Sequence, residues 1–119
     1  MADSMRALIV TDSPYQAVIL RHQLTTMGAD AAAVVGEDDA LVFLSQRGFD
    51  VVIIDLDLGV EVVESLVLRL RRDLPRSTIA ILADWGDRRA AEVQSLTPTM
   101  IYKPVNGRQL QAALGGGGR

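Results

Sequence analysis

Two unbroken apolar runs dominate the pattern of hydrophobic and polar positions along the chain. They span residues 7–10 and 51–54, are rich in β-branched side chains, and are each followed by polar or acidic residues. Strands that are buried on both faces of a parallel sheet have this composition. Shorter apolar runs at 79–82 and 100–102, and an alanine-rich run at 31–35, look similar. The pattern therefore predicts five strands.

Segments with helical periodicity separate these strands. Ser13 is a helix-capping residue and Pro14 suits the first helical position, so the first helix is expected to begin there and to stop at Gly28. Its predicted apolar face consists of Ala17, Leu20, Leu24 and Met27. The remaining helices are expected over 38–46, 60–72, 87–96 and 107–114.

Strand and helix alternate five times along the chain of 119 residues. Parallel neighbours need crossover connections, and these are right-handed. We therefore predict a single (βα)5 domain of the α/β class over residues 1–114. Its five-stranded parallel sheet should have the flavodoxin-like order 2-1-3-4-5, with helices on both faces. The glycine-rich residues 115–119 are expected to form a flexible tail or linker.

Composition narrows the classes of function. The net charge is −3 and the basic residues are dispersed, which does not favour nucleic acid as a partner. The chain has no cysteine, so thiolate metal sites and thiol redox chemistry are excluded, and a cytoplasmic location is compatible with this. No apolar run approaches the roughly 18 residues of a spanning helix, and we expect no membrane segment.

Charged residues follow the predicted strands at their carboxyl ends, where open parallel sheets bind ligands. Asp12 follows the first strand, Asp55 and Asp57 follow the third, and Lys103 follows the fifth. Hard carboxylate oxygens suit Mg²⁺, and a carboxylate beside such an ion can attack a phosphoryl group while an ammonium group offsets charge. A single Asp at a strand end is more often a turn or cap residue, so the prediction depends on the joint placement of these residues.

Three ordered motifs resemble the receiver domains of bacterial two-component response regulators, the CheY-like family. They are LIVTDSP at 8–14, DVVIIDL at 50–56 and YKPV at 102–105, and the resemblance extends over residues 6–114. Each motif is weak alone, and their order and spacing make the set specific.

The resemblance implies roles for four residues. Asp55 would accept a phosphoryl group from a histidine kinase, and Asp12 would be a direct Mg²⁺ ligand. Asp55 itself and the backbone carbonyl of Asp57 would complete the metal ligands of the protein. Lys103 would contact the phosphoryl oxygens.

Four positions depart from the family pattern. Thr11 replaces the first acid of the metal-binding pair, which should weaken the metal site without abolishing it. Ala83 replaces the Ser or Thr hydroxyl that binds the phosphoryl group and moves on activation. Asp84 adds a charge that, at about 4 Å and an effective dielectric constant of about 20, would cost about 4 kcal/mol beside another anion. Met100 occupies the position of the aromatic switch residue.

Two functional hypotheses follow. The first is a phosphorelay receiver that takes a phosphoryl group on Asp55 with Mg²⁺. The second is a degenerate pseudo-receiver that acts through its surface without phosphorylation, with Trp85 and Tyr102 as candidate partner residues, although both can equally pack against neighbouring helices. His22 is interpreted as a surface residue.

Both hypotheses name the same kind of partner, a histidine kinase or another domain of the same signalling protein, which can be a hybrid kinase. A homodimer is also left open. The first loop, with an acid and a proline, does not suit a flavin or nucleotide phosphate. The sequence shows no paired nucleophile and base, so we do not expect an enzyme with turnover. At most, the chain would catalyse its own stoichiometric phosphorylation and dephosphorylation.

Overall fold

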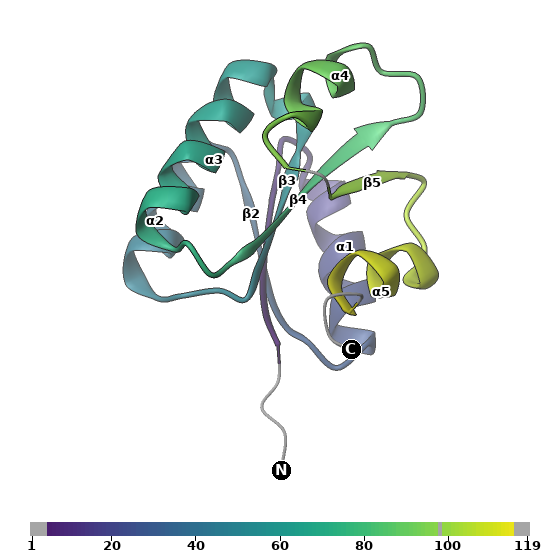
Figure 1. Ribbon diagram of the computed structural model, residues 1–119. Helices are drawn as coiled ribbons and strands as arrows, with labels where there is room; N and C mark the ends of the chain where they lie inside the picture. The colour runs from purple at the N-terminus through teal and green to yellow at the C-terminus, as the bar shows by residue number, and fades with distance from the viewer. Residues whose placement is uncertain (1–4, 98, 116–119) are drawn as a thin grey trace.

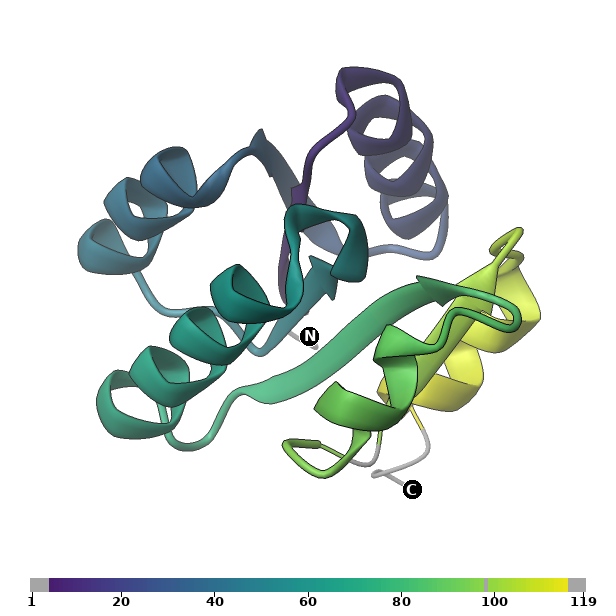
Figure 2. The ribbon, with the colours of Figure 1, turned by 90° about the horizontal axis from the view of Figure 1, so that it is seen from above.

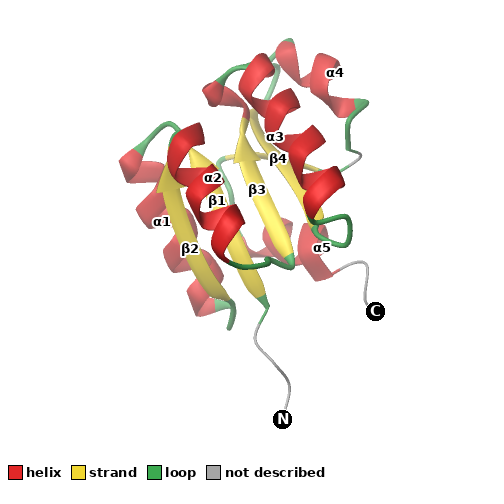
Figure 3. Ribbon diagram, turned by 90° about the vertical axis from the view of Figure 1, so that its left-hand side faces the viewer, coloured by secondary structure: helices red, strands yellow, loops and turns green. Residues whose placement is uncertain are grey.

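The computed structural model describes the backbone of residues 5–97 and 99–115. Over these residues, five parallel strands form one sheet in the order β2-β1-β3-β4-β5 (Figure 3). The strands are β1 (Arg6–Thr11), β2 (Asp30–Val35), β3 (Val51–Asp55), β4 (Thr78–Asp84) and β5 (Met100–Lys103). The helices are α1 (Pro14–Thr26), α2 (Glu37–Gln46), α3 (Val60–Asp73), α4 (Arg89–Gln94) and α5 (Gly107–Gly115), with a short 3-10 helix η1 (Leu56–Leu58) after β3. The predicted fold class and strand order are confirmed.

Helices cover both faces of the sheet, as Figures 1 and 2 show. On one face α1 and α5 pack over Ile9 and Ile53, and on the other α2, α3 and α4 pack over Leu8 and Ile54. Successive residues of β1 and β3 therefore face opposite cores, and every side chain of the two strands except that of Arg6 is buried. This explains why both strands are uninterrupted apolar runs.

The first helix begins as predicted. The Ser13 hydroxyl accepts a hydrogen bond of 3.2 Å from the backbone N–H of Gln16, and Gly28 ends the helix with a φ of 95°. The predicted apolar face is wrong at one position, because the Met27 side chain is 41% exposed. Met27 is the C-cap residue, beyond the last helical turn, so its side chain leaves the face that Leu20 and Leu24 bury.

The fourth helix is shorter than the predicted range 87–96. The Asp87 carboxylate accepts a hydrogen bond of 2.9 Å from the backbone N–H of Arg89, and this local turn occupies the positions before the helix. The ends of α2, α3 and α5 each differ from the prediction by one residue. None of the described helices is long and apolar enough to cross a membrane.

The register of the sheet sets which residues meet at its carboxyl edge. Val10 pairs with Ile54, so Thr11 lies level with Asp55 in the neighbouring strand. Further along the sheet, Asp84 of β4 pairs with Lys103 of β5. The residues that follow the apolar runs are thus brought to one edge of the sheet.

Candidate functional site

The carboxyl edge of the sheet brings together the three carboxylates and the lysine that the sequence singled out. Asp12, Asp55 and Asp57 each offer a carboxylate oxygen, and these oxygens lie within 4.8 Å of one another. The Lys103 ammonium is 3.3 Å from Asp55 Oδ1 and 2.9 Å from Asp57 Oδ2. All four predicted residues therefore belong to one site, and its oxygen donors fit a hard divalent cation.

Asp55 is a buried carboxylate whose two oxygens are both held by the protein. It is 1% exposed. Its Oδ1 accepts hydrogen bonds from the backbone N–H of Asp57 at 2.9 Å and from Lys103 at 3.3 Å. Its Oδ2 accepts a hydrogen bond of 2.9 Å from the Thr11 hydroxyl. A buried charge is tolerated only when it is paired and hydrogen-bonded, and these contacts supply both conditions.

Thr11 stands where the resemblance places an acid, and the structure shows what the hydroxyl does there. Its side chain is fully buried, donates to Asp55 and accepts a weak hydrogen bond of 3.2 Å from the backbone N–H of Ser13. A second carboxylate at this place would repel Asp55 unless a cation lay between them. The Thr11 hydroxyl instead stabilises the Asp55 carboxylate by donating a hydrogen bond and adds no further charge.

Lys103 is shared between two carboxylates. Burial alone would lower the pKa of Lys103, but hydrogen bonding and attraction to Asp57 and Asp55 outweigh it and raise that pKa above its usual value. In return, the hydrogen bond from Lys103 lowers the pKa of the Asp57 carboxyl, and Arg89 adds to this effect. Lys103 and Asp57 are therefore both charged at neutral pH.

Arg89, the first residue of α4, lies outside the predicted site and contacts it through the Asp57 side chain, a contact that the sequence did not indicate. Its Nη2 lies 2.8 Å from Asp57 Oδ1 and 2.7 Å from Asp87 Oδ2. Asp57, Asp84 and Asp87 form a second group of neighbouring carboxylates, and the guanidinium already bridges two of them. The contact with Asp57 joins residues 32 apart in sequence, so no local pattern could have indicated it.

The other substituted positions surround this site. Ala83 is 1% exposed and faces the core under α3 and α4, where its methyl group offers no hydrogen-bond donor. Asp84 is exposed, and its carboxylate lies close to that of Asp57. Met100 is partly buried against the same core as Ala83. The charge of Asp84 therefore lies beside the acidic site, as the sequence suggested.

Trp85 and Tyr102 stack on each other, and Tyr102 also packs against the core under α3 and α4. Their ring centroids are 4.2 Å apart and the ring planes differ by 9°. Trp85 remains 72% exposed, although stacking covers one part of its ring. The pair joins the segment after β4 to strand β5, with Trp85 exposed and Tyr102 partly buried.

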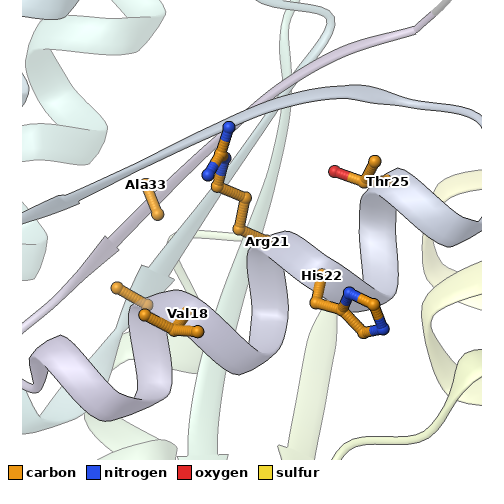
Figure 4. A pocket seen from close by; sticks show the side chains of 6 residues that line it. Val18, Arg21, His22, Thr25 and Ala33 are labelled. Atoms are coloured by element: carbon orange, nitrogen blue, oxygen red, sulfur yellow. The ribbon is translucent and has the colours of Figure 1, made fainter.

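A hollow of about 420 Å³ lies along α1, away from the acidic site (Figure 4). Val18, Arg21, His22, Thr25 and Ala33 are among its lining residues. His22 is exposed there, as predicted, and the Arg21 side chain donates a hydrogen bond of 3.2 Å to the backbone carbonyl of Ala31 on the edge strand β2. The residues that line this hollow do not include Asp12, Asp55, Asp57 or Lys103.

The fold and the site define a class of protein, a doubly wound α/β domain with a carboxylate and lysine cluster at the strand switch point. Solved structures of CheY-like receiver domains match it over nearly the whole chain. A response regulator receiver domain (CheY-like) from Methylobacillus flagellatus is 28% identical, with a TM-score of 0.76, covering 96% of this chain and 98% of that one. The chain has the fold of the CheY-like response regulator receiver domains.

Two further solved structures are similar. A sensor protein from Polaromonas sp. JS666 is 27% identical, with a TM-score of 0.81, covering 95% of this chain and 94% of that one. A response regulator protein from Burkholderia pseudomallei with a phosphorylated aspartic acid, calcium ion and citrate is 24% identical, with a TM-score of 0.81, covering 94% of this chain and 66% of that one. The sequence itself matches no protein-family model and none of the curated proteins.

Proposed function

We propose that this chain is a signal receiver that accepts a phosphoryl group on Asp55 from a phosphohistidine donor. The observation that supports this most directly is the buried Asp55 carboxylate, fixed by an ammonium group and a backbone N–H at the end of β3. In the transfer, an Asp55 oxygen forms a bond to phosphorus and the P–N bond to the donor imidazole breaks. The leaving imidazole takes up a proton.

Asp12, Asp55 and the backbone carbonyl of Asp57 would hold a divalent cation, which we propose is Mg²⁺. The donor set is oxygen only, which fits a hard ion. When bound, Mg²⁺ supplies charge stabilisation to the transferred oxygens. Lys103 already contacts Asp55 Oδ1 and is placed to donate hydrogen bonds to a phosphoryl group there.

The partner in this proposal is a histidine kinase or another domain of the same signalling protein, in the cytoplasm. The similar structure described as a sensor protein supports a partner of the signalling class. We assign residues 1–114 to the receiver and 115–119 to a tail or linker; α5 extends to Gly115, and residues 116–119 lie outside the described part of the chain. The transfer is stoichiometric, so the chain is not proposed as an enzyme with turnover.

A second candidate function, binding of a partner without phosphorylation, is favoured by a specific observation. The Thr11 hydroxyl holds Asp55 Oδ2, and Ala83 offers no donor to a phosphoryl group. In this case the stack of the exposed Trp85 on Tyr102 would be part of the binding surface.

Intact mass spectrometry separates the two functions. The wild type, Asp55→Asn and a matched control, Asp39→Asn, are incubated with acetyl phosphate and Mg²⁺, or with EDTA in place of Mg²⁺. Asp39 is an exposed carboxylate in the first turn of α2 and does not belong to the group formed by Asp12, Asp55 and Asp57. The proposal expects one added phosphoryl group in the wild type and the control, with Mg²⁺ only, and none in Asp55→Asn. No added mass in the wild type would favour the phosphorylation-independent function.

A further inference from the structure

Arg89 ties the segment between β4 and α4 to the candidate acceptor site. On one side its guanidinium forms two hydrogen bonds with Asp87, from Nε at 3.1 Å and from Nη2 at 2.7 Å, and its backbone N–H donates a third at 2.9 Å. On the other side the same Nη2 donates to Asp57 at 2.8 Å. Hydrogen bonding to these carboxylates raises the pKa of Arg89 further, so the guanidinium stays charged.

Through Asp57, this contact continues to the buried acceptor. Asp57 Oδ1 binds Arg89, its Oδ2 binds Lys103 at 2.9 Å, and Lys103 in turn lies 3.3 Å from Asp55 Oδ1. Charges of alternating sign therefore connect Asp55 to the first residue of α4, and no contact along the way exceeds 3.3 Å. A contiguous network of this kind can transmit a change of charge at one end.

The segment between β4 and α4 lacks the hydroxyl group that would connect it directly to a phosphoryl group on Asp55. Ala83, the penultimate residue of β4, stands where the resemblance expects a hydroxyl that contacts the phosphoryl group and moves, and a buried methyl group can do neither. Arg89 follows six positions later, at the opposite end of the same connecting segment. The planar guanidinium group of Arg89 binds Asp87 through two nitrogens and Asp57 through one of them. The single ammonium group of a lysine cannot reproduce this arrangement.

We propose that Arg89 is a positioning residue that couples the charge state of Asp55 to α4, in place of the hydroxyl that Ala83 lacks. This inference rests on the proposed phosphorylation of Asp55. A phosphoryl group adds negative charge beside Lys103, which Asp55 and Asp57 already share, and draws the ammonium away from Asp57. Asp57 then keeps Arg89 as its remaining cationic partner, and the attraction between Asp57 and the guanidinium becomes stronger. The segment between β4 and α4, which Arg89 anchors, shifts as a result.

Trp85 reports on this segment from within it. It is the only tryptophan of the chain, it lies between β4 and Arg89, and it stacks on Tyr102 of β5 with a centroid distance of 4.2 Å. Tyr102 is held by the sheet, so a shift of the segment changes the overlap of the two rings and with it the fluorescence of Trp85.

Three variants test the coupling alongside the wild type. Arg89→Gln removes the charge, Arg89→Lys keeps it without the planar guanidinium group, and Arg88→Gln is the matched control. Arg88 is exposed and makes no ion pair within the described part of the chain. Each protein is treated with acetyl phosphate and Mg²⁺, and intact mass and Trp85 emission are followed on the same sample. Urea unfolding verifies that each variant is folded.

We expect every protein to gain one phosphoryl group. The emission of Trp85 should change on phosphorylation in the wild type and Arg88→Gln, should not change in Arg89→Gln, and should change only in part in Arg89→Lys. A role in stability alone would alter the urea midpoint and leave the emission change intact. If Arg89→Gln does not fold, Asp87→Asn breaks the same connection from the loop side and should give the same loss.

Several results would overturn the inference. A phosphorylated Arg89→Gln with the full emission change, or a phosphorylated wild type without one, refutes the coupling and leaves the proposed function standing. Failure of Arg89→Gln alone to gain the phosphoryl group would place Arg89 in the transfer step instead. A wild type that gains no mass refutes the proposed function and the inference together.

Discussion

Replacement of Thr11 by valine tests whether the threonine hydroxyl holds the acceptor carboxylate. Valine has nearly the shape of threonine and fits the same buried position in β1, so the change removes a hydroxyl group without opening a cavity. The lost contact is the hydrogen bond of 2.9 Å to Asp55 Oδ2. Lys103 and the Asp57 N–H still hold the other oxygen of Asp55.

The size of the effect follows from the charge of the acceptor and its burial. Hydrogen bonds to charged groups contribute about 1.5–3 kcal/mol to stability. Burial of the new methyl group offsets this by up to about 0.8 kcal/mol. Thr11 also accepts a hydrogen bond from the backbone N–H of Ser13, and its loss adds about 1 kcal/mol or less. The net free energy of unfolding should therefore fall by about 1–3 kcal/mol.

A double-mutant cycle isolates the contact from these side effects. Urea unfolding followed by circular dichroism gives the free energy for the wild type, Thr11→Val, Asp55→Ala and the double variant. The Ser13 contact and the added methyl group occur in both backgrounds and cancel, so the coupling energy should be about 1.5–3 kcal/mol. A coupling below about 0.5 kcal/mol, the range of independent sites, would refute this interpretation of Thr11.

Three further predictions concern charge, metal and the aromatic pair. Lys103 lowers the pKa of Asp57, and Arg89 lowers the pKa of Asp87, so the two carboxylates stabilise the folded protein fully above their unfolded pKa of about 3.9 and lose this effect as the pH falls through their folded values. The urea midpoint should therefore fall less between pH 7 and pH 2 in the double variant Asp57→Asn/Asp87→Asn than in the wild type. An equal fall in both proteins would contradict this. Asp12→Asn should weaken the binding of Mg²⁺ by about tenfold or more in calorimetry, and unchanged affinity would remove Asp12 from the site. Tyr102→Leu should shift the emission of Trp85 and lower stability by about 0.5–1.5 kcal/mol beyond the lost area, whereas an unchanged spectrum would mean that the stack is absent in solution.

The sequence alone was sufficient for the architecture. Strands β1 and β3 are buried on both faces, so nearly all their side chains must be apolar, and this is visible without any tertiary information. Crossover connections then leave few arrangements for alternating strands and helices, and the observed order of the sheet is the predicted one. Because parallel strands end at the same edge, the convergence of Asp12, Asp55, Asp57 and Lys103 also followed from their positions in the chain.

Only the tertiary structure decided how the charges at that edge are paired. Arg89 reaches Asp57 across 32 residues, and Lys103 reaches Asp55 across 48, so both contacts depend on the tertiary structure bringing the start of α4 and the end of β5 to the edge of the sheet where β3 ends. The Thr11 hydroxyl likewise meets Asp55 because their strands are adjacent, and not because of any local motif. Periodicity in a sequence records which side chains are buried, since burial repeats along an element. Side-chain pairing depends on directions and distances between elements, which exist only once the chain has folded.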